Sequence, residues 1–194
     1  MWRIEDDLWD NWQSLKNMYF QAESWAPLVT PGNWPDADML PLGHIGIRAE
    51  RGGDRLTRLS RDEQKTMMTL WAMLRSPLMF GGDLPTADPF TLSLLTNAAV
   101  LAINQSGSNA RVAYTSDDLH VWTAQNGSTG DKYVAVFNLG DMPHTIHLDW
   151  NQIGIASPPA ETHELWSGQV FTRPQALEGT VASHGTVLYK IPAH

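Results

Sequence analysis

The residues best suited to chemistry lie in segment 31–42, which reads PGNWPDADMLPL. Two carboxylates, Asp36 and Asp38, are separated by a single residue and follow Trp34 closely. The prolines of this segment lack a backbone N–H, so it is unsuited to a helix or to the interior of a sheet, and we predict a rigid loop. Carboxylates accept hydrogen bonds from hydroxyl groups and a Trp ring offers a flat apolar face, so this combination is typical of a sugar-binding site.

Further acidic residues stand where an α/β fold could use them, namely residues 5–7 (EDD) before the first predicted helix and Asp83 after the apolar run 77–82. In α/β barrels, catalytic side chains follow the carboxyl ends of the strands. Each acid also has a structural explanation. Acids before a helix stabilise its dipole, the loop acids can form Asx-turns, and Asp83 can cap a turn. The acids alone leave both interpretations open.

Composition excludes several classes of protein. The chain has 194 residues, a formal net charge of −8 and no cysteine. An acidic chain is a poor partner for nucleic acid or an anionic membrane, and no apolar run is long enough to cross a bilayer. His144 and His147 fall on opposite faces of a predicted strand, and neither Gly-Gly pair is followed by the lysine of a phosphate-binding loop. We therefore expect no metal and no cofactor.

The first 105 residues alternate between helical and strand patterns, which is typical of a parallel α/β fold. Ser60 and Glu63 form a capping-box pattern, and Asp88-Pro89 is a second helix start. The predicted helices cover 8–24, 61–76 and 89–97, with a further ordered piece at 98–105. The predicted strands cover 25–30 and 77–82, and 48–58 is predicted to be a surface loop.

The remaining residues are rich in short β patterns separated by turn signals such as Asn126-Gly127. They predict an antiparallel sandwich, with strands at 111–115, 119–124, 133–139, 145–150, 162–166 and 186–191. We therefore divide the chain into residues 1–105 and residues 106–194. A complete (β/α)8 barrel needs about 250 residues, so we expect residues 1–105 to be only the C-terminal part of such a barrel.

Several motifs, in order, resemble glycoside hydrolase family 27, the α-galactosidases. They are WRIEDD at 2–7 with WDNW at 9–12, PGNWPDADML at 31–40, TLWA at 69–72, SPL at 76–78, GDL at 82–84 and AINQ at 102–105. The resemblance is dense over residues 1–105 and loose over the β-rich part. It implies a (β/α)8 barrel followed by a β-sandwich. It also implies that terminal α-linked galactose is hydrolysed with retention, by two carboxylates.

The same resemblance implies individual roles. Asp7 matches the general acid/base, Arg3 matches an arginine near the sugar 2-hydroxyl, and Asp38 and Met39 match residues that contact the sugar. Asp36 matches a structural acid. The nucleophile of the family lies in a Y-x-K-x-D-like run that this sequence lacks. We therefore expect a fragment that carries the acid/base without the nucleophile, is inactive by itself, and needs the missing N-terminal barrel portion to act on an α-galactoside.

Two alternatives remain at this stage. The β-rich half could be a non-catalytic carbohydrate-binding or structural module. Within the same family, the specificity could be that of an α-N-acetylgalactosaminidase or a β-L-arabinopyranosidase, because the groups that select the sugar come largely from upstream strands. The family suggests a secreted or periplasmic enzyme.

Overall fold

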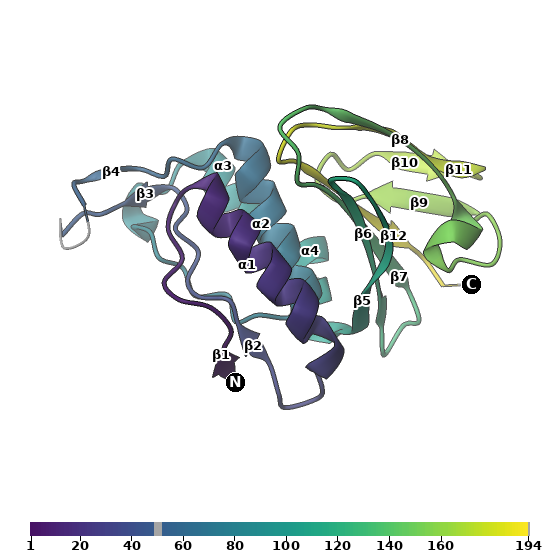
Figure 1. The fold of residues 1–194 in the computed structure, drawn as a ribbon, viewed down its shortest axis with the longest axis horizontal. Helices are drawn as coiled ribbons and strands as arrows, with labels where there is room; N and C mark the ends of the chain where they lie inside the picture. The colour runs from purple at the N-terminus through teal and green to yellow at the C-terminus, as the bar shows by residue number, and fades with distance from the viewer. Residues whose placement is uncertain (49–51, 194) are drawn as a thin grey trace.

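A computed structural model describes residues 1–48 and 52–193, which form a helical region beside a β-sandwich (Figure 1). Helices α1 (Trp12–Trp25), α2 (Arg61–Leu74), α3 (Pro89–Leu95) and α4 (Ala98–Ser106) make up the first region. α1 and α2 lie side by side between the N-terminal loops and the sandwich (Figure 1). None of the described helices is long and apolar enough to cross a membrane.

The predicted helix starts are confirmed for α2 and α3. Ser60 and Glu63 form the complete capping box of α2, and the Asp88 side chain accepts a hydrogen bond from the Thr91 N–H at the start of α3. The prediction for the first helix was four residues too long at its start. Asn11 is the N-cap of α1 and accepts from the Ser14 N–H, so the residues before it are free to line a site.

The first region contains short strands only. β1 (Trp2–Arg3) pairs in parallel with β2 (Pro35–Asp36), and β3 (His44–Ile45) pairs antiparallel with β4 (Arg55–Leu56). Beyond β2, an isolated parallel bridge joins Leu40 to Phe80. The chain at 35–40 is therefore flanked by β1 and by the segment around residue 80.

Three predictions for this region were wrong or incomplete. Segment 25–30 is not a strand, because η1 (Ala26–Leu28) turns there with a proline in its first turn. Segment 77–82 forms a bridge instead of a full strand, and η2 (Leu84–Thr86) follows it. The predicted loop 48–58 contains β4, and its residues 49–51 lie outside the described part of the chain.

The sandwich confirms the second half of the prediction. Its larger sheet has the order β10-β9-β12-β7-β6-β5, and its smaller sheet pairs β11 with β8. All six predicted strands are present: β5 (Gly107–Ser116), β6 (Leu119–Asn126), β7 (Lys132–Asn138), β8 (His144–Asp149), β9 (Glu161–Glu164) and β12 (Thr186–Ile191). β10 (Val170–Thr172) and β11 (Ala176–Val181) were missed, since one is very short and the other contains the turn-like Glu178-Gly179 pair.

The larger sheet buries both of its faces, which gives the molecule two apolar cores. One face packs against the helices through Trp122, and the indole N–H of this residue donates to the Tyr19 hydroxyl at 2.6 Å. The other face packs against the smaller sheet through Val121 and Val136. Because neighbouring residues of a strand point to opposite faces, β6 contributes to both cores.

Candidate active site

The loops that follow β1 and β2 meet at a cavity of about 280 Å³. Asp7 comes from the loop after β1, and Asp38 and Met39 come from the loop after β2. Because β1 and β2 are parallel, their carboxyl ends lie at the same edge, and the segments that leave them converge. The lining also includes Leu8, Trp9, Asp10, Pro41, Ile45, Gly46, Arg55 and Gly81.

Asp38 is the fixed point of this site. Its Oδ2 accepts from Arg3 Nη2 at 2.6 Å and from the Leu8 N–H at 2.7 Å, and its Oδ1 accepts from the Met39 N–H at 2.7 Å. The residue is only 6% exposed, so these donors replace the water that the carboxylate has lost. Its backbone is left-handed, with φ 78°.

Two further contacts hold the Asp38 backbone in this conformation. Asp36 Oδ1 accepts from the Asp38 N–H at 2.9 Å, which is an Asx-turn, and the indole N–H of Trp71 donates to the Asp38 carbonyl at 3.0 Å. Trp71 belongs to α2 and is fully buried. The core of the protein therefore positions the loop, and Asp36 serves it as a structural acid.

Arg3 connects Asp38 to the loop after β1. Its Nε donates to the Glu5 carbonyl at 2.9 Å, and its Nη2 donates to the Asp6 carbonyl at 3.2 Å. The same Nη2 lies 3.5 Å from Asp7 Oδ1. Within the described residues no acceptor faces Nη1, so this end of the guanidinium retains N–H groups that a ligand could use.

Asp7 differs from Asp38 in its freedom. Its side chain is 73% exposed at the cavity, and Arg3 is its one polar partner among the described residues. The alternative that Asp7 stabilises a helix dipole is wrong, because α1 begins at Trp12 and has no acid in its first turn. Asp7 is thus an accessible carboxylate beside a fixed guanidinium.

Apolar side chains form part of the rim of the cavity. Met39 is 48% exposed and lies over Gly81, where a Cβ atom would come within 2.7 Å of the Met39 sulfur. Trp9 is 42% exposed and lines the cavity beside Asp7. Gly81 therefore leaves the space that Met39 occupies.

The prediction that Trp34 is the aromatic face of the site was wrong. Trp34 precedes β2, so it lies at the opposite end of that strand from Asp38, and its ring stacks on the Arg75 guanidinium at 4.2 Å. Trp9 takes the place beside the acids. Asp83 is also outside the cavity, where its carboxylate accepts from the Thr86 hydroxyl at 2.6 Å in the turn of η2.

Sequence reasoning missed the pair Asp10 and Arg55 at the edge of the cavity. Arg55 Nη2 donates to Asp10 Oδ1 at 2.7 Å, and the Arg58 N–H donates to Asp10 Oδ2 at 3.0 Å. Burial would raise the pKa of Asp10, but the hydrogen bonds from Arg55 and Arg58 outweigh it and hold the pKa below its ordinary value. The pair ties β4 to the start of α1. Segment 48–58 was predicted only as a surface loop, so neither residue was assigned a partner.

The described residues hold no group of three or more His, Asp or Glu side chains that could bind a metal ion. His147 instead contacts Glu178 at 2.8 Å across β8 and β11. The side chains that line the candidate site are three carboxylates, the Arg55 guanidinium and mostly apolar groups.

Comparison with known families identifies both parts of the chain. The family described as "Alpha galactosidase A" matches residues 1–106, and the "Alpha galactosidase C-terminal beta sandwich domain" matches residues 116–191. The chain therefore belongs to the α-galactosidases of glycoside hydrolase family 27, a family of glycosidases. The predicted fold, the C-terminal part of a (β/α)8 barrel followed by an antiparallel β-sandwich, is confirmed.

Individual relatives place the chain within that family. An α-galactosidase from Oryza sativa subsp. japonica is 29% identical over 191 residues, which cover 97% of this chain and 43% of the relative. The crystal structure of a GH27 β-L-arabinopyranosidase from Geobacillus stearothermophilus has a TM-score of 0.93 and 44% identity, and covers 100% of this chain and 45% of its own. A candidate α-N-acetylgalactosaminidase from Bacillus halodurans C-125 has a TM-score of 0.87 and 39% identity. The match covers 97% of this chain and 44% of that protein. The chain spans less than half the length of these proteins.

Proposed function

We propose that this chain carries the acid/base half of a retaining glycosidase site that cleaves terminal α-linked galactose. The observation that carries the proposal is the triangle of Arg3, Asp7 and Asp38. Arg3 Nη2 lies 2.6 Å from Asp38 and 3.5 Å from Asp7. The two aspartates lie in the loops that follow the parallel strands β1 and β2 at the same edge. This arrangement leaves one carboxylate accessible and fixes the groups around it.

In the proposed mechanism Asp7 protonates the glycosidic oxygen and afterwards takes a proton from the attacking water. Its exposure at the cavity allows it to reach both. Arg3 is held by Asp38 and offers its Nη1 N–H groups to a sugar hydroxyl, and Asp38 contacts the sugar through lone pairs that its protein donors leave open. Met39 covers the apolar face of the ring.

A retaining reaction needs a second carboxyl group about 5–5.5 Å from the first. Asp38 is already occupied by three N–H donors and is a poor nucleophile. The chain spans less than half the length of its relatives, and we propose that a preceding portion of the barrel supplies the nucleophile. Residues 1–105 would then complete the catalytic domain, and 106–194 would be the sandwich domain.

A second specificity is favoured by one observation. Over the region that matches this chain, the β-L-arabinopyranosidase from Geobacillus stearothermophilus is 44% identical to it, whereas the plant α-galactosidase is 29% identical. β-L-Arabinopyranose has the ring of α-D-galactose without the C6 hydroxymethyl group. Residues outside this chain that face C5 would therefore decide between the two sugars.

The test uses two proteins, the 194-residue chain by itself and a hybrid in which it replaces the matching segment of that arabinopyranosidase. We expect no turnover of aryl α-galactoside or aryl β-L-arabinopyranoside by the chain alone, and turnover by the hybrid. Clear turnover by the chain alone would contradict the missing nucleophile. A folded but inactive hybrid would contradict the acid/base assignment.

A further inference from the structure

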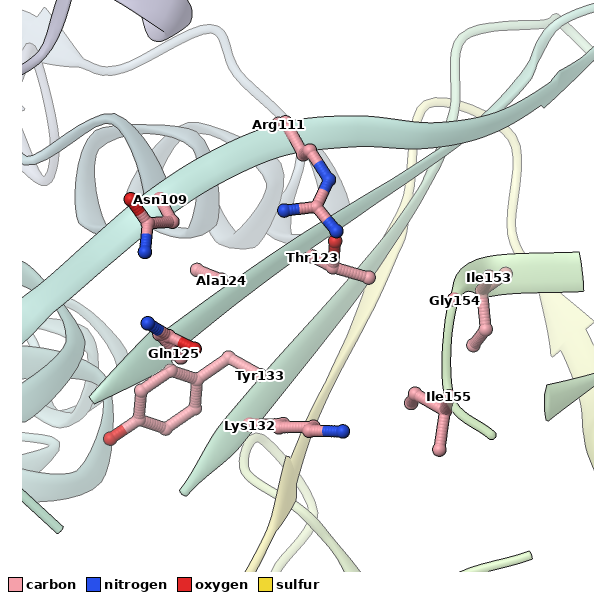
Figure 2. A pocket seen from close by; sticks show the side chains of 10 residues that line it. All are labelled: Asn109, Arg111, Thr123, Ala124, Gln125, Lys132, Tyr133, Ile153, Gly154 and Ile155. Carbon is pink, nitrogen blue, oxygen red and sulfur yellow. The ribbon is translucent and has the colours of Figure 1, made fainter. Parts of the chain in front are cut away.

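A second polar cavity, of about 200 Å³, lies on the sandwich, far along the chain from the candidate active site. It is formed by β5, β6, β7 and the turn that follows η3 (Trp150–Ile153) (Figure 2). We propose that this cavity binds the carboxylate end of an acidic monosaccharide unit, such as a uronic acid. The proposal does not depend on the catalytic role of Asp7.

The register of the sheet brings the polar side chains together. Arg111 lies directly opposite Thr123, and Gln125 lies directly opposite Lys132. Cross-strand partners share a face, and residues two apart on a strand share it too, so these four side chains stand on one face of the sheet. Figure 2 shows Arg111 reaching from β5 toward Thr123, and Lys132 reaching from β7 toward the turn at Ile155.

This face is the inner face of the sandwich. Thr123 is opposite Val134, which is fully buried between the two sheets. Arg111 and Lys132 are exposed on this face, and the buried side chains of Ile153 and Ile155 line the cavity beside them. The cavity therefore has polar side chains from the larger sheet on one side and the two isoleucines on the other.

The polar groups of the cavity have few partners in the protein. No hydrogen bond or ion pair from the described residues satisfies the side chains of Arg111 or Lys132, whereas the nearby Lys190 is paired with Asp131 at 2.8 Å. The Thr123 hydroxyl is buried and likewise has no partner in the described part of the chain. An unsatisfied buried hydroxyl is costly, so a bound group that accepts its hydrogen bond would be favoured.

The lining selects the class of ligand. It has two cations and no acidic side chain, in a protein of net charge −8. A guanidinium and an ammonium together favour an oxyanion. The carboxamides of Asn109 and Gln125 can bind hydroxyl groups, and the isoleucine wall can pack on ring C–H groups. The volume of this cavity is below about 300 Å³, the lower end of the range for drug-sized ligands, so it suits a ligand as small as one sugar unit.

The experiment titrates glucuronate into the 194-residue chain and follows binding by calorimetry and by amide shifts of β6 and β7. We expect glucuronate to bind, D-glucose not to bind, and added salt to weaken the affinity. Arg111→Gln and Lys132→Gln should each weaken binding about tenfold, the effect of one charge-assisted hydrogen bond. The control Arg173→Gln removes an exposed charge from the same domain without touching the cavity, and it should leave the affinity unchanged.

Three results would overturn the proposal. The first is the absence of glucuronate binding by a chain whose thermal unfolding is normal. The second is binding that Arg111→Gln and Lys132→Gln do not weaken, because the ligand would then lie elsewhere, as in the cavity of Asp7. The third is inorganic phosphate binding at least as tightly as glucuronate, because the cavity would then recognise a bare anion.

Discussion

The two halves of the molecule are held together in different ways. In the sandwich, strands of up to ten residues form a six-stranded ladder, whereas the strands of the helical region have two residues each. The helical region therefore depends on side chains and on the sheet beside it: Trp122 and Phe137 of the sandwich belong to the same core as Leu15 and Trp71. The sandwich is held by backbone hydrogen bonds between its own strands. The helical region, which carries the loops of the candidate site, is held by side-chain packing that includes residues of the sandwich.

The largest expected effect comes from Trp122, which joins the two halves. Trp122→Ala removes a fully buried side chain and its hydrogen bond to Tyr19, and should lower the free energy of unfolding by about 4 kcal/mol. Urea unfolding followed by circular dichroism measures this value. Hydrogen exchange should show α1 and α2 losing more protection than β8 and β11.

The matched control for Trp122 is its neighbour Val121, which faces the other core. Val121→Ala should reduce protection in β8 and β11 more than in the helices. If both variants reduce protection uniformly over the chain, the two halves unfold as one unit, and the contrast drawn between them is wrong.

The next effect concerns the anchor of the site. Asp38→Asn preserves shape but replaces a carboxylate that accepts from three N–H donors, one of them on Arg3, so it should cost about 2 kcal/mol of unfolding free energy. Asp36→Asn loses at most one neutral-donor contact and should cost clearly less. Equal losses in urea titrations would mean that the Arg3–Asp38 pair does not hold the loop.

Acid should weaken each half through one carboxylate. The folded pKa of Asp10 is below its ordinary value of 3.8, because hydrogen bonds from Arg55 and Arg58 outweigh the opposing effect of burial. The pKa of Asp131 in the sandwich is also below its ordinary value: burial would raise it, but hydrogen bonds from Lys190 and Ala193 outweigh burial. For a lowered folded pKa, the stabilisation is complete above the ordinary value and is lost as the pH falls below it toward the folded pKa.

Unfolding free energies measured between pH 6 and pH 2 test this acid dependence. We expect stability to fall below about pH 4. Asp10→Asn and Asp131→Asn should each make the decline shallower and lower the stability at pH 6. A decline as steep as that of the unmodified chain in both variants would exclude these two carboxylates as its cause.

The smallest expected effect is at the junction of the two halves. His184 stacks on Trp12 at 4.0 Å, and its ring nitrogens lie 2.8 Å from Glu63 and 2.9 Å from Asp141. The hydrogen bond from His184 also holds the pKa of Asp141 below its ordinary value. His184→Asn tolerates the left-handed backbone there, with φ 56°, and should cost about 1 kcal/mol in urea unfolding. No loss would mean that the junction rests on apolar packing alone.

The sequence predicted much of the fold because its signals were local. The capping box at Ser60, the N-cap at Asp88 and the alternating β patterns each depend on neighbouring residues, and they are confirmed. The strand predicted at 25–30 was wrong because an apolar run of that length does not distinguish a strand from a turn of 3-10 helix. β10 has three residues, too few for a pattern.

The candidate site was harder to predict because its contacts are distant in sequence. Segment 31–42 was predicted to be a loop because of its prolines, but residues 35–36 form β2 and Leu40 bridges Phe80. Trp34, which was expected beside the acids, precedes β2 and stacks on Arg75 instead. Asp10 and Arg55 are 45 residues apart in the sequence, and the residues around each of them do not predict that the two side chains pair. The roles of Asp7, Arg3, Asp38 and Met39 were taken from a resemblance and remain predictions.

The most direct test of the account is the effect of Asp7→Asn on leaving-group dependence in the active hybrid enzyme. A general acid matters most when the leaving group is a poor one. We predict that Asp7→Asn lowers kcat/KM by at least about a hundredfold for a disaccharide and much less for an activated aryl glycoside. Equal losses on both substrates, or no loss on either, would contradict the assignment of Asp7 as the acid/base.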